Sequence, residues 1–118
     1  MKKHFWWMSV ALWLPLQAAA QDGRFHSPVD IPFLMSGSFG EPRPNHFHCG
    51  IDVKTQGVVG KRVLSVYDGY VSRLTVGYDG FGNAVYVTHP NGLVSVYCHL
   101  NEFVPALKEV VRRCQYKE

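Results

Sequence analysis

The sequence predicts a mainly β fold, in which an antiparallel sheet is followed by one short C-terminal helix. From Lys61 onward β-branched and aromatic residues dominate, and the turn dipeptides Asp68-Gly69 and Asn91-Gly92 interrupt them. Apolar residues at helical spacing occur near the C-terminal end of the chain. The 118 residues are enough for a single small domain with a thin hydrophobic core.

Residues 1–20 have the pattern of a secretory signal peptide. A basic start, M-K-K, leads into a short apolar run and then a small-residue end, A-A-A, before Gln21. The apolar run contains Pro15 and falls short of the roughly 20 residues that span a bilayer, so a retained anchor is disfavoured. We therefore expect a domain over residues 21–118 that is exported to the periplasm, the cell envelope or the medium.

Charge and cysteine content exclude several kinds of protein. Removal of Lys2 and Lys3 with the leader would leave ten basic residues against nine acidic ones, so no basic surface indicates nucleic-acid binding. Cys49, Cys98 and Cys114 would enter an oxidising compartment, and their odd number leaves at least one unpaired within the chain. No C-x-x-C spacing occurs, which disfavours a zinc knuckle or a thioredoxin-type site.

Four segments are expected to form the strands of an antiparallel meander. They are K-R-V-L-S-V (61–66), Y-V-S-R-L-T-V (70–76), A-V-Y-V-T-H-P (84–90) and L-V-S-V-Y-C-H-L (93–100). Asp68-Gly69 suits a tight turn between the first two. The glycine-rich segment 77–83 joins two strand patterns and opens no helix, so it is expected to be a loop and not a phosphate-binding cradle.

Asn91-Gly92 is a strong hairpin signal and fixes an expected register. If these two residues form the loop, Pro90 pairs with Leu93, and His99 lies across from Ala84 on the face turned away from the core. His89 falls on the core face, where a packed and hydrogen-bonded histidine is the expected outcome. The predicted core face comprises Val85, Val87, Val94, Val96 and Cys98, and the opposite face comprises Ala84, Tyr86, Thr88, Ser95, Tyr97 and His99.

Residues 101–114 are expected to form a short helix that covers the sheet edge. Asn101 is a candidate N-cap, and Pro105 is compatible with a first turn. Arg112-Arg113 would then complement the helix dipole in the last turn. The apolar positions at helical spacing are Phe103, Leu107, Val110 and Val111.

The stretch N-H-F-H-C-G-I-D-V-K-T, residues 45–55, contains a candidate metal pair, His48 and Asp52. In a straight strand these two residues share a face but lie about 13 Å apart, at roughly 3.3 Å per residue, which is too far for one ion. A bend at Gly50 could bring the imidazole and the carboxylate together. Zinc accepts both ligand types.

Several elements in order along the chain carry a family resemblance. The segments S-G-S-F-G-E-P-R-P-N-H-F-H-C-G-I-D-V, V-Y-D-G-Y-V-S-R, G-F-G-N-A-V-Y-V-T-H-P-N-G and V-Y-C-H-L resemble the lysostaphin-type zinc endopeptidases of bacterial cell walls. The likeness spans residues 33–103. It implies an antiparallel sheet of the duplicated hybrid motif type, incomplete in this chain, and zinc-dependent cleavage of peptide cross-links or stems in peptidoglycan.

The resemblance also implies roles for particular residues. His48 and Asp52 match the first two zinc ligands of the family, and His99, within Y-C-H-L, matches a histidine that works beside the metal. His46 is assigned a supporting role, and Arg43 could approach a substrate carboxylate. The family takes its third ligand and a second working histidine from an H-x-H motif further downstream, and no histidine follows His99 in these 118 residues. We therefore expect a partial domain with weak or no peptidase activity on its own, unless another chain or segment completes it.

Three other functions remain open at this point. A non-catalytic domain that binds the cell wall or activates an amidase would tolerate an incomplete metal site. A lipoyl-type carrier would need a modifiable lysine at the Asn91-Gly92 tip, where there is none. A cysteine hydrolase using Cys49 or Cys98 with His99 is disfavoured, because Cys98 and His99 face opposite sides in the expected register.

Overall fold

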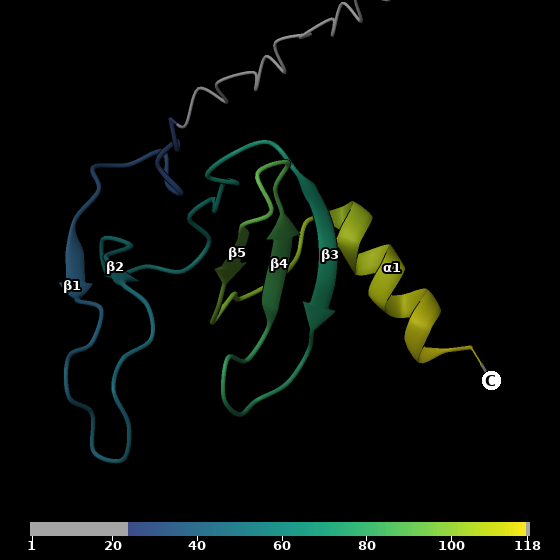
Figure 1. Ribbon diagram of the computed structural model, residues 1–118. Coiled ribbons are helices and arrows are strands. Elements are labelled where there is room, and N and C mark those ends of the chain that lie inside the picture. Colours follow the sequence, from purple (N-terminus) through teal and green to yellow (C-terminus); the bar gives the residue numbers. More distant parts are fainter. Residues whose placement is uncertain (1–23, 118) are drawn as a thin grey trace, which may run out of the picture.

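The computed structural model describes residues 24–117, so the leader predicted over residues 1–20 lies outside the described part. It contains a two-stranded antiparallel sheet, β1-β2, and a three-stranded antiparallel sheet of order β3-β4-β5 (Figure 1). The elements are β1 (Met35–Gly37), β2 (Asp52–Val53), β3 (Tyr70–Thr75), β4 (Ala84–Thr88), β5 (Val94–Tyr97) and α1 (Pro105–Gln115). The mainly β class with one short C-terminal helix is thereby confirmed for the described residues.

The strand predicted over residues 61–66 is wrong. Within this segment Val63 forms only an isolated bridge with Val29. The amide of Leu64 donates to the carbonyl of Pro28 at 2.8 Å. Proline has no N–H with which to continue such a ladder, so the pairing does not extend into a strand.

The hairpin between β4 and β5 has a register one residue away from the predicted one. Thr88 pairs with Val94, and His89 takes the place next to Leu93, so the loop holds three residues, 90–92. Pro90 supplies the φ that the first central position of a type I turn needs, and Gly92 has φ 82°, the left-handed residue that closes such a loop. Proline thus overrides the two-residue turn that Asn91-Gly92 alone would favour.

The shifted register changes which side chains are buried. Val85 and Val87 lie in the core with Phe103, as their alternation predicts. Val94 and Val96 are exposed, in contrast to the prediction. Further side chains packed against this core are Leu74, Tyr97, Leu100, Leu107 and Val111. Of these, Tyr97 was expected on the opposite face, and Ala84, also expected there, is fully buried.

Helix α1 begins later than predicted and has no side-chain cap. Its N-cap is Val104, with ψ 155°, and Pro105 occupies the first turn. A residue before proline is pushed into extended backbone, so the helix cannot start upstream at Asn101. The helix lies beside β3, as Figure 1 shows, and Arg112 and Arg113 occupy its last turn as predicted. No helix within residues 24–117 is long and apolar enough to cross a membrane.

His89 is buried and fully hydrogen-bonded, which confirms the prediction of a packed histidine. Its Nδ1 lies 2.7 Å from the Asp68 carbonyl, so that nitrogen carries the hydrogen, and Nε2 lies 2.9 Å from Ser95 Oγ. Ser95 Oγ contacts the hydroxyl of Tyr97 at 2.9 Å, and that hydroxyl accepts from the Val66 amide at 2.8 Å. These hydrogen bonds fix the segment before β3 against the sheet.

Candidate metal site

A narrow antiparallel loop carries most of the candidate site. The His48 amide donates to the Glu41 carbonyl at 2.9 Å, and the Arg43 amide donates to the His46 carbonyl at 2.8 Å. Glu41 therefore lies opposite His48, and Arg43 lies opposite His46, with Pro44-Asn45 at the tip. Opposed residues in such a ladder have Cβ atoms about 5 Å apart, which places the Glu41 carboxylate beside the His48 imidazole.

The Asp52 carboxylate is placed by the pairing of β1 with β2. Asp52 pairs with Gly37, next to an irregularity in the register. A Cβ on Gly37 would lie 2.4 Å from Asp52 Oδ2 and 2.9 Å from Arg43 Nη2. The missing side chain at Gly37 therefore gives the carboxylate and the guanidinium the space that they occupy.

The predicted approach of His48 to Asp52 is present. The backbone bends at Gly50, and His48 Nε2 lies 3.2 Å from Asp52 Oδ1. A Cβ on Gly50 would meet nothing within 4 Å, and the backbone there is not left-handed, so the bend does not require glycine.

The hydrogen bonding of His48 fits a metal ligand. Its Nδ1 lies 3.0 Å from the Ser38 carbonyl, and a carbonyl only accepts, so Nδ1 carries the hydrogen. Nε2 is then the ring atom that faces Asp52 Oδ1, and either a proton on Nε2 or a metal ion between the two atoms can bridge them. Two ligands held at about 2.0–2.2 Å from one tetrahedral ion are separated by roughly 3.4 Å, close to the observed spacing.

Arg43 joins the two carboxylates of the site. Its Nη2 donates to Asp52 Oδ2 at 2.7 Å and also to Glu41 Oε1. The Arg43 hydrogen bond is the main cause that lowers the pKa of Asp52, and charges on His48, Arg43 and His99 act in the same direction. The pKa of Glu41 is also lowered, chiefly by the amide of Ser38, which donates to Oε2.

His99 is exposed, as predicted, but for a different reason. It follows the end of β5 with φ 56°, outside the alternation of the strand, and its amide donates to the Phe81 carbonyl at 2.9 Å. A Cβ on Gly82 would lie 3.7 Å from His99 Nδ1, so the glycine-rich loop supports the ring. The charge of His99 is the smallest of the causes that lower the pKa of Asp52.

One group among the described residues could hold a metal ion. Ligand atoms of Glu41, His48 and Asp52 all lie within 4.8 Å of one another. Imidazole and carboxylate donors are the set that zinc takes in hydrolytic sites. The His48 and Asp52 donors thus fit zinc, and Glu41, which the sequence did not indicate, lies beside them with its two oxygens held by Arg43 and the Ser38 amide.

The family comparison agrees with this geometry. The model of peptidase family M23 matches residues 46–116, more than half of the chain. The chain belongs to peptidase family M23. This is the lysostaphin-type family, whose members are typically metal-dependent, so the M23 match and the three-residue group support each other. No curated protein and no solved structure matches the chain.

Sequence reasoning missed two residues of this candidate site. Glu41 and Gly37 lie in the quoted segment S-G-S-F-G-E-P-R, but no role was assigned to them. The alternation of E-P-R before Pro44-Asn45 and H-F-H after it is the signal that pairs Glu41 with His48. His46 contacts Asn45 Oδ1 at 2.7 Å, and the structure does not place it at the carboxylates.

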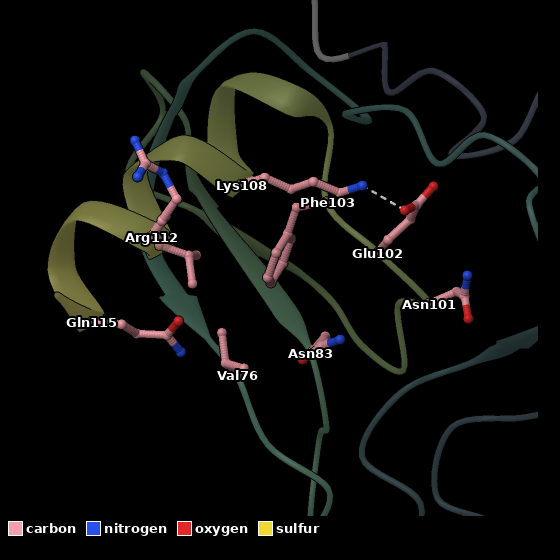
Figure 2. A pocket seen from close by; sticks show the side chains of 9 residues that line it. Val76, Asn83, Asn101, Glu102, Phe103, Lys108, Arg112 and Gln115 are labelled. Carbon is pink, nitrogen blue, oxygen red and sulfur yellow. Dashed lines mark hydrogen bonds and ion pairs between the residues drawn. The ribbon is translucent and has the colours of Figure 1, made fainter.

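A surface hollow of about 270 Å³ lies elsewhere, along α1 and beside the end of β3 and the start of β4 (Figure 2). Its lining includes Val76, Asn83 and Phe103, and Lys108 pairs with Glu102 at its rim. None of His48, Asp52 and His99 lines this hollow. Its two cations, Lys108 and Arg112, are already paired with Glu102 and Glu109, and the hollow gives no indication of a ligand.

The cysteines are free thiols. Cys98 is half-buried, and burial, together with the charge of Cys49, raises its pKa. A raised pKa reduces the thiolate fraction, which is the nucleophilic form. The cysteine-hydrolase alternative therefore gains no support from Cys98.

Proposed function

We propose that this chain contributes the metal-binding part of a zinc endopeptidase that cleaves peptide cross-links or stems in peptidoglycan. The observation that carries the proposal is the convergence of His48 Nε2 and Asp52 Oδ1 at 3.2 Å in a chain of family M23. Export to the periplasm or cell envelope belongs to the same proposal, because the substrate lies there.

The residues of the site would divide the work of amide hydrolysis. His48 and Asp52 would hold zinc, which when bound supplies Lewis-acid activation of water and of the scissile carbonyl. His99, exposed just after β5, would accept a proton from the attacking water or donate to the developing oxyanion. His46 and Asn45 lie at the exposed tip of the loop, where they could contact the peptide.

A further chain or segment is proposed to complete the domain. β3 and β5 each pair only with β4 among the described residues, so both edges of that sheet have unpaired backbone groups. Several large apolar side chains are also exposed, including Val71, Val94 and Val96. A strand added at an edge would cover such groups and could bring another metal ligand. Because these 118 residues lack that added ligand, we expect weak activity from them alone.

Zinc stoichiometry and cross-link cleavage by the purified chain without its leader test the proposal. The expected result is one zinc per chain, bound at least about 100-fold more weakly after His48→Ala, because one of the few ligands is lost. His46→Ala is the matched control and should retain the zinc. Absence of zinc binding, or equal binding by the His48→Ala variant, would contradict the proposed function.

A non-catalytic domain that binds the wall or activates an amidase is the second candidate. Arg43 forms ion pairs with both Glu41 and Asp52, so the negative charge of the two carboxylates is partly neutralised without a metal ion. The site segment is therefore expected to keep its structure in the metal-free chain. Binding to isolated peptidoglycan separates the two candidates. A binder keeps its affinity after His48→Ala and in the presence of a chelator, whereas an enzyme loses metal and turnover together.

A further inference from the structure

Arg43 and Glu41 form an ion pair whose position suggests a task beyond holding the loop together. Arg43 Nη2 contacts Asp52 Oδ2, which leaves Oδ1 as the oxygen that faces His48. Glu41 holds the same nitrogen from the other side, and its own Oε2 accepts from the Ser38 amide. Nη2 of the guanidinium therefore bridges Asp52, the metal-ligand candidate, and Glu41, which is itself held by the backbone at Ser38.

We propose that Glu41 and Arg43 act as a clamp that positions Asp52, so that only Oδ1 is offered to the cation. The inference rests on the proposed zinc site and adds two positioning residues to it. A carboxylate with one oxygen held by a guanidinium ligates through the other, which suits a four-coordinate ion. Cations that need six to eight oxygen ligands gain less from such a carboxylate.

Two features of the packing support this assignment. Gly37 leaves room for Arg43 Nη2 and Asp52 Oδ2 together, since a Cβ there would lie within 3 Å of both. Arg43 Nε is buried and has no hydrogen-bond partner within the described residues. An unpaired buried N–H opposes folding, so stability alone does not explain an arginine at this position. The hydrogen bond from Arg43 to Asp52 gives a reason for an arginine at this position.

The experiment measures zinc affinity by chelator competition in variants chosen for charge. Arg43→Lys keeps the charge but ends one bond short of the position of Nη2, which makes both contacts, and the double variant Glu41→Gln/Arg43→Met removes one charge of each sign. We expect both to bind zinc about 10-fold more weakly than the parent chain, the range found for residues that orient metal ligands. Arg62→Lys, which alters an exposed pair with Asp30, is the matched control and should leave affinity unchanged.

A spectroscopic measurement separates positioning from a structural role. With cobalt in place of zinc, release of Asp52 lets both its oxygens bind, which raises the coordination number and weakens the visible absorption band. Thermal unfolding of the metal-free variants should show no loss for Arg43→Lys, because that substitution also removes the unpaired Nε–H.

The outcomes of these measurements show whether Glu41 and Arg43 position Asp52. Parent-like affinity and cobalt spectra in both variants would overturn the clamp while leaving the zinc site intact. Weaker binding by the double variant with unchanged or tighter binding by Arg43→Lys would also overturn it, because Glu41 would then be a direct ligand. Absence of zinc binding by the parent chain would overturn the zinc site and the clamp together.

Discussion

The segment that carries the candidate metal site and the three-stranded sheet are stabilised by different kinds of interaction. In the sheet, Val85, Val87 and Phe103 are buried, and the polar group among them, His89, is hydrogen-bonded on both ring nitrogens. In the site segment β1 and β2 are short, and the contacts that fix the side chains run between charged groups. The sheet should therefore determine whether the chain folds, and the site segment should respond to charge, pH and metal without unfolding it.

Phe103→Ala should give the largest effect on stability. Phe103 is buried just before α1 and packs against the sheet. Phenylalanine-to-alanine changes in a core cost about 3–5 kcal/mol, a large fraction of the stability of a small domain. Thermal unfolding followed by circular dichroism should show a melting temperature lower by more than about 10 °C. A shift comparable with that of a surface variant such as Tyr78→Ala would show that the core does not dominate.

Gly69→Ala and Gly37→Ala apply one chemical change to the two regions. At Gly69 a Cβ would lie 2.4 Å from the backbone carbonyl of Thr88, which cannot move cheaply, so we expect a loss of about 2 kcal/mol in unfolding free energy. At Gly37 the Cβ would meet the ends of the Asp52 and Arg43 side chains, which can turn away. That variant should lose about 1 kcal/mol or less but bind zinc about 10-fold more weakly.

Parallel unfolding and zinc titrations on the two glycine variants check this contrast. Gly69→Ala should lower the unfolding free energy without directly changing zinc affinity. Gly37→Ala should lower zinc affinity with the smaller change in unfolding free energy. Equal effects of both variants on both measurements would show that the two regions are not separable.

The success of sequence reasoning also differs between the two regions. The His48 and Asp52 pairing required only local geometry, one bend within five residues, and the structure shows it. The hairpin register failed because Pro90 and Asn91-Gly92 favour different turns, and a shift of one residue changes the face of every side chain in β5. Glu41 was missed although the alternation on either side of Pro44-Asn45 pairs it with His48, whereas Gly37 could not be assigned because its role depends on the pairing of β1 with β2.

Acid should weaken the site segment before it unfolds the sheet. The pKa of Asp52 is lowered in the folded chain, mainly by its hydrogen bond with Arg43. A lowered folded pKa contributes stability above the ordinary carboxyl pKa, and this contribution is lost as pH falls through the lowered value. In the presence of chelator, the unfolding free energy should decline below about pH 4 in the parent chain and decline less steeply after Arg43→Met. Identical slopes would show that this ion pair does not contribute.

Gly50→Ala should have the smallest effect, although Gly50 was the residue on which the predicted bend depended. Its backbone is not left-handed, and a Cβ there would meet no atom within 4 Å. Alanine also restricts the unfolded chain more than glycine does, which favours folding by a few tenths of a kcal/mol up to about 1 kcal/mol. We therefore expect zinc affinity within about two-fold of the parent and equal or slightly higher stability. A loss of zinc affinity as large as that of Gly37→Ala would mean that the bend itself, and not the space above Gly37, sets the distance between His48 and Asp52.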